Sequence, residues 1–353
     1  MPELSRRTVL RSGTVAAAAS AVGAAAAMAP STAFAADPAH AAAAPAPQRP
    51  RRGTIRVLTW NIYRGGTGVS PENLPLLLDQ LVALRPDVYL AVETYGAGDR
   101  IRRELSRRAG NGQYTGIKIT DRPAGDDNLW IFTHLPVDRV HPRPAGGTHV
   151  TDFNLGGVRL RLPNRRQLDA FVLWCNYTNP WDGYLIDENA AAIRAGLTPR
   201  HSQADVVAAG SRQTAHVEEV VRYHLPAMVG DDQVPLVIGG DFNTLPAADW
   251  TAANAGKPNH FGMSYGLTAT RVLTDAGFVD TFRAAHPDAA VEGRTWSPLP
   301  TERLITPQRI DMIFAKGDVT VRGGDVVDTQ LSNHQSGTFY SDHAAVWTDL
   351  SIR

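Results

Sequence analysis

The sequence predicts one α/β (α+β) domain built on mixed β-sheets. Short apolar segments typical of strands alternate with segments whose apolar residues recur every three or four positions, as in helices. Several strand segments follow one another without a helix between them, which favours mixed sheets over purely parallel ones. The chain has 353 residues, of which 43% are hydrophobic and 20% charged, so it can bury a large core.

The individual elements follow from these patterns along the chain. Residues 54–62 have a strand pattern, and leucines at helical spacing predict a helix over 71–84. A short apolar strand follows at 87–93, and Ile101 and Leu105 mark the narrow apolar edge of the next helix. The later expectations are strands at 129–132 and 171–175, a helix over 203–229, and strands at 234–240, 309–314 and 344–350. We expect the two glycines that end the 234–240 segment to turn the chain.

Charge and cysteine content exclude several classes of protein. The 35 basic residues equal the 35 acidic ones in number, which argues against a general polyanion binder with a basic surface overall. The one cysteine, Cys175, excludes an intramolecular disulfide framework and a cysteine-rich metal site. Because Cys175 lies inside an apolar strand, we expect it to be a small buried hydrophobe rather than a nucleophile.

The beginning of the chain predicts export. Residues 1–35 resemble a Tat-type signal peptide, with a twin-arginine pair, an uncharged apolar stretch over 13–29 and an Ala-Phe-Ala cleavage pattern. That stretch is too short and too weakly apolar for a membrane span, so we expect no stable membrane anchor. Residues 36–53, rich in Ala and Pro, predict a disordered linker, and residues 54–353 the folded domain. The expected mature protein is secreted and monomeric, with the Tat export machinery as a partner.

Polar residues recur at the ends of the predicted strands. Asp241 and Asn243 stand two apart in Gly-Gly-Asp-Phe-Asn, so on an extended chain both point to one face. An Asp or Asn at a strand end usually caps a turn, but Asp311 interrupts an apolar run. A buried carboxylate there needs a partner such as an imidazole. The candidate site residues are Asn61, Glu93, Asp241, Asn243, Asp311, Asp342 and His343.

These motifs, taken in order, resemble the endonuclease/exonuclease/phosphatase superfamily. The motifs are Trp-Asn-Ile, the strand-end Glu93, Gly-Asp-Phe-Asn, Arg-Ile-Asp and Ser-Asp-His, and the likeness covers residues 54–353. The segment 241–251 is also similar to a subgroup of secreted bacterial metal-dependent hydrolases. The resemblance implies a four-layer sandwich, with two mixed β-sheets packed face to face and flanked by helices. It also implies a phosphoesterase that hydrolyses a phosphodiester or phosphomonoester.

The resemblance further implies a metal cofactor. A phosphoester is anionic and resists attack, so the site needs a cation and a base that activates water. Glu93 would be the principal ligand of Mg²⁺, which prefers hard oxygen ligands, and Mn²⁺ would be a substitute. Asn61 and Asp342 would lie near this ion or bind it.

The same resemblance implies roles in catalysis. Asp241 would orient or deprotonate the attacking water, while Asn243 and Asn61 hold the phosphate and the nucleophile. His343 would donate to a phosphoryl oxygen, and Asp311 would fix the tautomer of His343 and raise its pKa.

One position departs from the family pattern. The family usually has a histidine, or sometimes a tyrosine, at the end of a middle strand, where this chain reads Trp-Cys-Asn-Tyr-Thr. Asn176 fills that position, with Tyr177 as the neighbouring alternative. Asparagine can hydrogen-bond a phosphate but cannot carry its proton at pH 7, so a reduced or altered activity stays open.

Three functions compete on the sequence alone. The first is a phosphoesterase acting on nucleic acid or on a small-molecule or lipid phosphoester, and arginines within 100–108 would favour the nuclease if they formed a basic patch. The second is a sphingomyelinase-like lipid phosphodiesterase, which would need an exposed apolar hairpin that the sequence does not show. The third is a secreted binding protein that has lost catalysis, which Asn176 supports and the remaining site residues oppose. Trp181 and Tyr184 would either stack on a substrate or pack their loop.

Overall fold

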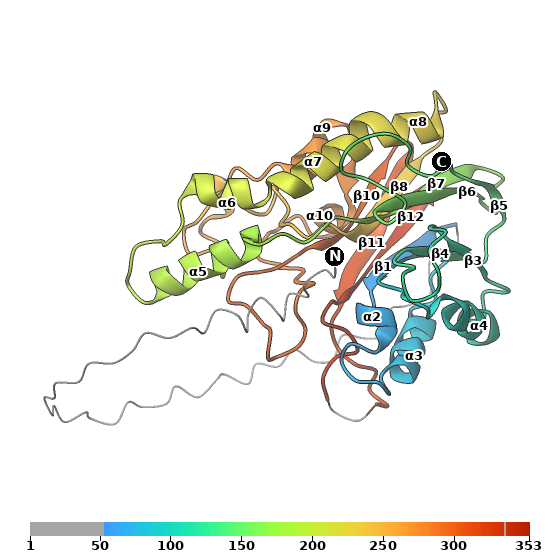
Figure 1. Cartoon of the computed structure of the whole chain (residues 1–353), viewed down its shortest axis with the longest axis horizontal. Helices are drawn as coiled ribbons and strands as arrows, with labels where there is room; N and C mark the ends of the chain where they lie inside the picture. Colours follow the sequence, from blue (N-terminus) through green and yellow to red (C-terminus); the bar gives the residue numbers. More distant parts are fainter. Residues whose placement is uncertain (1–52, 335–336) are drawn as a thin grey trace, which may run out of the picture. The chain divides into compact units, whose positions relative to one another are not determined.

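The computed structural model describes residues 53–334 and 337–353 (Figure 1). The predicted signal peptide and all but the last residue of the predicted linker lie outside the described residues. Within them, no helix combines the length and apolar character needed to cross a membrane. The described chain forms two six-stranded mixed sheets with helices on their outer faces.

The first sheet has the strand order β11-β12-β1-β2-β4-β3. Its central strands β1 and β2 are parallel, and every other neighbouring pair is antiparallel. The expected strands at 54–62, 87–93, 129–132 and 344–350 all belong to it. The strands are β1 (Ile55–Asn61), β2 (Val88–Val92), β3 (Thr115–Lys118), β4 (Trp130–Thr133), β11 (Val319–Val327) and β12 (Ala345–Ile352).

The second sheet has the order β5-β6-β7-β8-β10-β9 and repeats the same plan. Its central strands β7 and β8 are parallel, and the remaining pairs are antiparallel. The strands are β5 (Val137–Val140), β6 (Leu155–Arg161), β7 (Gln167–Trp174), β8 (Leu236–Asp241), β9 (Val279–Asp280) and β10 (Asp311–Lys316).

The core lies in three layers that hold these sheets and helices together. Between the sheets, Val57 and Leu90 of the first pack with Val172 and Val237 of the second. The outer face of the first sheet is covered by α3 (Leu74–Leu84) and α4 (Gly98–Arg108), and that of the second by α7 (Ser211–Glu219), α8 (Leu225–Val229) and α9 (Ala269–Asp275) (Figure 1). The predicted four-layer α/β sandwich is therefore confirmed.

A fourth apolar cluster stabilises an insertion between β7 and β8. It contains α5 (Asp182–Arg194) and α6 (Gln203–Ala209), and its aromatic centre includes Trp181, Trp250 and Trp296. Trp181 is buried and packs edge-on against Trp296, so it packs its loop and does not offer a stacking surface.

The single helix expected over 203–229 is broken twice. Gly210 separates α6 from α7, and a π-helical turn at Val220–His224 separates α7 from α8. Pro226 lies in the first turn of α8, and its missing N–H removes one bond of a continuous helical ladder. A short helix, α10 (Thr281–Ala285), completes the elements discussed below.

The glycines expected to turn the chain lie inside β8 instead. A Cβ at Gly240 would lie 1.7 Å from the carbonyl oxygen of Leu173 in β7. Glycine is therefore required there by the close approach of two backbones, not by a turn.

Candidate active site

The sheet topology brings the ends of several strands together. Asn61 ends β1 and Glu93 follows β2, and because these strands are parallel, both side chains lie at one edge of the first sheet. In the second sheet, Asp241 ends β8 and pairs with Asp311, the first residue of the antiparallel strand β10. His343 precedes β12, the antiparallel neighbour of β1.

Asn61 joins the two sheets at this point. Its amide nitrogen lies 3.1 Å from Glu93 Oε1, 3.2 Å from Asp241 Oδ2 and 3.5 Å from His343 Nε2. The backbone N–H of Tyr63 donates to Asn61 Oδ1 at 3.0 Å. Because that N–H can only donate, it fixes the amide orientation and directs the NH₂ group into the cluster.

Asp241 is held by Asn243 and by the adjacent strand. The backbone N–H of Asn243 donates to Asp241 Oδ1 at 2.9 Å, and its side-chain amide donates to Asp241 Oδ2 at 3.1 Å. The same amide donates to the Cys175 carbonyl at 2.7 Å, so both of its hydrogens are engaged. Asn243 therefore orients Asp241, and its predicted contact with the phosphate stays a prediction.

His343 and Asp311 form the buried pair that the sequence predicts. His343 Nδ1 lies 2.8 Å from Asp311 Oδ2, and His343 Nε2 lies 3.9 Å from Asp241 Oδ2. Burial alone would lower the pKa of His343, but the carboxylates of Asp311 and Asp241 outweigh it and raise that pKa to about 9. The imidazole is therefore cationic at neutral pH and can donate a proton from Nε2.

Glu93 lies beside the cluster on a strained backbone. Its φ is 56° and that of Asn243 is 51°, in a region that non-glycine residues rarely adopt. Asn128 Oδ1 accepts from the Glu93 backbone N–H at 2.9 Å, and Arg64 N–H donates to Glu93 Oε2 at 3.1 Å. Arg64 belongs to the left-handed turn α2 (Tyr63–Gly66). Such positive-φ residues persist where their surroundings enforce them, often at functional sites.

The carboxylates of this cluster, rather than its cationic imidazole, fit a divalent cation. Asp241, Asp311 and His343 present ligand atoms that all lie within 4.8 Å of one another, and all three are buried. Glu93 and Asp342 add further carboxylates, so acidic groups outnumber the one imidazole, and Asp311 Oδ1 has no hydrogen-bond partner among the described residues. Such hard oxygen donors suit Mg²⁺. Asn61 Oδ1 accepts from Tyr63 N–H and keeps a second lone pair, so its predicted place near or on the ion stays a prediction.

Asn176 lies two residues beyond Trp174, the buried last residue of β7. Its side-chain oxygen accepts from Asn154 Nδ2 at 3.1 Å, and its carbonyl accepts from Gln213 Nε2 at 2.8 Å. Cys175 before it is buried, and burial raises the pKa of its thiol well above the usual range, as expected for a structural cysteine. Tyr177 packs near Trp181, with ring centroids 6.5 Å apart.

Several supporting residues have no clear sequence signal. Thr295 Oγ1 accepts from the backbone N–H of Asp311 at 3.0 Å, from a loop remote in sequence. Ser341 Oγ donates to the Asn61 carbonyl at 2.8 Å and accepts from His343 N–H at 3.1 Å, so it links the two motifs. Only Ser341 lies in a recognisable motif, Ser-Asp-His, where its hydroxyl could have been considered.

The sequence matches the Endonuclease/Exonuclease/phosphatase family over residues 58–343, which spans every candidate residue of the site. The chain belongs to this family. It is therefore an enzyme, a hydrolase of the phosphoesterase and nuclease class. Family enzymes of this class use divalent metal ions, in agreement with the acidic cluster.

Relatives of this family member share most of its length. A Caenorhabditis elegans protein, F14F9.5, is 24% identical over 315 residues, covering 84% of this chain and 91% of that protein. The human Nocturnin catalytic domain with bound sulfate has a TM-score of 0.53 at 16% identity, covering 86% of this chain and 96% of that chain. D. rerio TDP2 complexed with a single strand DNA product has a TM-score of 0.52 at 12% identity, covering 84% and 98%. At these identities the two solved structures show the shared fold.

Proposed function

We propose that the protein is an exported, Mg²⁺-dependent phosphodiesterase that cleaves by attack of water, with nucleic acid as the leading substrate class. The observation that carries the proposal is the buried Asp311–His343 pair, whose Nε2 faces Asp241 and Asn61 across the two sheets. This arrangement places a proton donor, His343 Nε2, 3.9 Å from a proton acceptor, Asp241 Oδ2.

Glu93 and Asp342 would hold the cation. When bound, Mg²⁺ neutralises negative charge that develops on the phosphoryl oxygens. Asn61 keeps Glu93 in place through its amide, and Arg64 N–H satisfies the second carboxylate oxygen. These contacts pre-organise Glu93.

The remaining residues move and hold protons. Asp241, fixed by Asn243, accepts a proton from the attacking water, and the cationic His343 donates from Nε2 to a phosphoryl oxygen. Asp311 holds the His343 ring through Nδ1, so that Nε2 always points at the substrate side. Asn176 can donate a hydrogen bond to the phosphate but supplies no proton.

The choice of nucleic acid over a lipid as substrate is supported by one solved structure and by the sequence pattern. The D. rerio TDP2 structure holds a single strand DNA product, and its fold is the one found here. The sequence shows no exposed apolar hairpin that would favour a sphingomyelinase-like enzyme. The proposal of export is supported by the twin-arginine pair and the Ala-Phe-Ala pattern of residues 1–35. The similarity of residues 241–251 to a secreted bacterial subgroup also supports it.

Hydrolysis by the purified chain comprising residues 36–353 tests the activity. The panel contains plasmid DNA, RNA, sphingomyelin and bis-p-nitrophenyl phosphate, each with Mg²⁺ and with EDTA. We expect EDTA-sensitive cleavage of the nitrophenyl diester and of nucleic acid. Preferred cleavage of sphingomyelin would assign the lipid phosphodiesterase instead, and no cleavage by a folded protein would favour the binding protein. A fusion of residues 1–53 to a reporter, with the twin arginines changed to lysine, tests Tat export.

Glu93→Gln tests the metal assignment directly. We expect the Mg²⁺ affinity, measured by calorimetry, to fall roughly 100-fold, because a carboxylate ligand becomes neutral. Cleavage of the nitrophenyl diester should fall in parallel. Glu72→Gln is the matched control, since Glu72 is an exposed glutamate outside the site. Unchanged Mg²⁺ affinity in Glu93→Gln would remove Glu93 from the metal site.

A further inference from the structure

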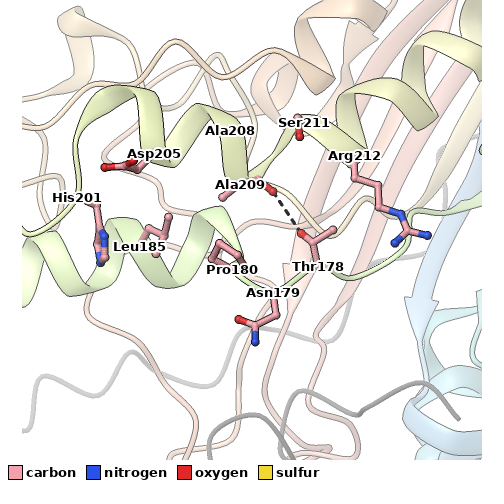
Figure 2. Close-up of a pocket in the computed structure, with 10 residues that line it drawn as sticks. All are labelled: Thr178, Asn179, Pro180, Leu185, His201, Asp205, Ala208, Ala209, Ser211 and Arg212. Carbon is pink, nitrogen blue, oxygen red and sulfur yellow. Dashed lines mark hydrogen bonds between the residues drawn. The ribbon is translucent and has the colours of Figure 1, made fainter. Parts of the chain in front are cut away.

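A pocket of about 540 Å³ lies beside the catalytic cluster and contains none of the site residues above. It is formed by the segment after β7, by α5 and α6, and by the beginning of α7 (Figure 2). Its volume falls within the range of small-molecule binding sites, roughly 300–1,000 Å³. Its walls include Thr178, Asn179, Pro180, Leu185, Arg212 and Asp205.

Hydrogen bonds connect this pocket to the catalytic residues. Asn243, which orients Asp241, donates to the Cys175 carbonyl at 2.7 Å and accepts from Trp181 Nε1 through its own carbonyl at 2.7 Å. Asn243 therefore holds the residues on both sides of the segment 176–180. Gln213 Nε2 donates to the Asn176 carbonyl and to Thr178 Oγ1, which ties the pocket wall to the residue after the β7 strand.

The two ends of the pocket differ in charge. At the end farther from Thr178, His201 pairs with Glu188 at 2.7 Å, and Asp205 accepts from Ser202, so these charges are already engaged (Figure 2). Pro180 and Leu185 form an apolar wall between the two ends. An anion would be repelled by Asp205 and must bind at the opposite end.

Arg212 supplies a cation at that opposite end. Figure 2 shows its side chain beside Thr178, at the end tied to the catalytic residues. Among the described residues, its guanidinium has neither a hydrogen bond nor an ion pair, in contrast to Arg159 of the neighbouring sheet, which pairs with Asp169 and Asp232. A planar guanidinium with free N–H groups matches the oxygens of a phosphate.

We propose that this pocket binds the nucleoside part of a phosphoester that carries a second phosphate, and that Arg212 contacts this second phosphate. The inference rests on the proposed phosphodiesterase function and names its substrate class. The apolar wall takes the sugar and base, and Asn179 offers amide hydrogen bonds to a base edge. The second phosphate comes either from the next nucleotide of a strand or from a free nucleoside bisphosphate.

Direct binding tests the pocket without requiring hydrolysis. Calorimetric titration with thymidine 3′,5′-bisphosphate, with Ca²⁺ in place of Mg²⁺, compares wild type, Arg212→Ala and Arg200→Ala. Arg200 is the matched control because it is an exposed arginine of the same insertion that does not line the pocket. We expect Arg212→Ala to weaken binding roughly tenfold, the scale of one charge-assisted contact. Arg200→Ala should match wild type.

A pair of esters tests the same contact during turnover. Thymidine 5′-(p-nitrophenyl phosphate) is compared with its 3′-phosphorylated form, which has the same leaving group. The ratio of kcat/KM values, phosphorylated over unphosphorylated, should fall roughly tenfold in Arg212→Ala and be partly restored in Arg212→Lys. Competition by oligothymidylate and by the bisphosphate then distinguishes a strand from a free nucleotide as the source of the second phosphate.

The outcomes separate the two proposals. Equal bisphosphate affinity in wild type and Arg212→Ala, or an equal loss in Arg200→Ala, overturns the pocket assignment even if the nitrophenyl diester is cleaved. Absence of diester cleavage with retained, Arg212-dependent bisphosphate binding overturns the phosphodiesterase and leaves the pocket.

Discussion

Two groups of buried carboxylates flank the start of β10, and they are neutralised in opposite ways. Asp249 and Asp280 are paired with arginines: Arg309 Nη2 lies 2.8 Å from Asp280 and its Nε 2.9 Å from Asp249, which also pairs with Arg283. Two residues further along, the Asp311 carboxylate lies against the imidazole of His343 and the carboxylate of Asp241, and no arginine pairs with it among the described residues.

The difference separates a structural network from a functional one. Burial alone would raise the pKa of Asp249, but Arg309 and Arg283 lower it, so the carboxylate stays charged and satisfied. In the site, several carboxylates share one imidazole, and Asp311 Oδ1 lacks a hydrogen bond within the described residues. Buried charge that the protein balances itself stabilises the fold, whereas unbalanced buried charge is available for a cation and a substrate.

Arg309→Met should have the largest effect on stability. It removes the cation between Asp249 and Asp280 and leaves uncompensated charge in the core, so the free energy of unfolding should fall by about 3–5 kcal/mol. Urea denaturation measures this loss. Arg322→Met, at an exposed arginine, is the control. A loss no larger than that of the control would show that the arginine network is not structural.

Asp311→Asn should lower activity strongly and change stability little. It leaves the site less negative, so stability should change by under about 1 kcal/mol, but His343 loses the carboxylate charge that raises its pKa. We expect kcat/KM for the nitrophenyl diester to fall roughly 10²-fold. Steady-state kinetics and urea denaturation are measured together, with Asp318→Asn at an exposed position as control. A stability loss near that of Arg309→Met would erase the distinction between the two groups.

Glu219 extends the comparison to a carboxylate balanced by backbone groups. Burial alone would raise its pKa, but N–H groups of Thr148 and His149 and the ring of His224 lower it to about 2. A lowered folded-state pKa adds stability above the unfolded value near 4.5, and that stability is lost as pH falls toward 2.

Glu219→Gln should therefore cost about 2 kcal/mol at pH 7 and progressively less between pH 4.5 and 2. Urea denaturation at pH 7 and pH 3 measures the difference. Glu218→Gln is the matched control, because Glu218 is more exposed than Glu219 and its ion pair among the described residues is with Arg222. A loss that stays the same at both pH values would contradict the role of the carboxylate charge.

Sequence patterns predicted the central elements better than the peripheral ones. Buried strands such as Val88–Val92 have continuous apolar runs that only a core position explains. Short edge strands such as Val279–Asp280 and the insertion helix Asp182–Arg194 lack a strong period, because they are stabilised by tertiary contacts rather than by a periodic apolar face. The helix break at Gly210 and Pro226 was visible in residue type but not in the apolar spacing.

The candidate site shows the same division. The residue types of Asn61, Glu93, Asp241, Asp311 and His343 follow from motifs in the sequence, and so does the expectation that Asp311 meets an imidazole. The orientation of the Asn61 amide and the engagement of Asn243 do not follow from it, because each depends on one hydrogen bond from a neighbouring segment.

The sequence by itself determined which residues this enzyme has for chemistry, because phosphoester hydrolysis demands those residue types and strand patterns put each at a strand end. Only the tertiary structure decided what each residue does there. Two parallel strand pairs, one in each sheet, meet at their carboxyl ends and bring Asn61 within 3.2 Å of Asp241, 180 positions later in the chain. That contact depends on how two sheets pack, and neither spacing nor composition encodes a distance between them.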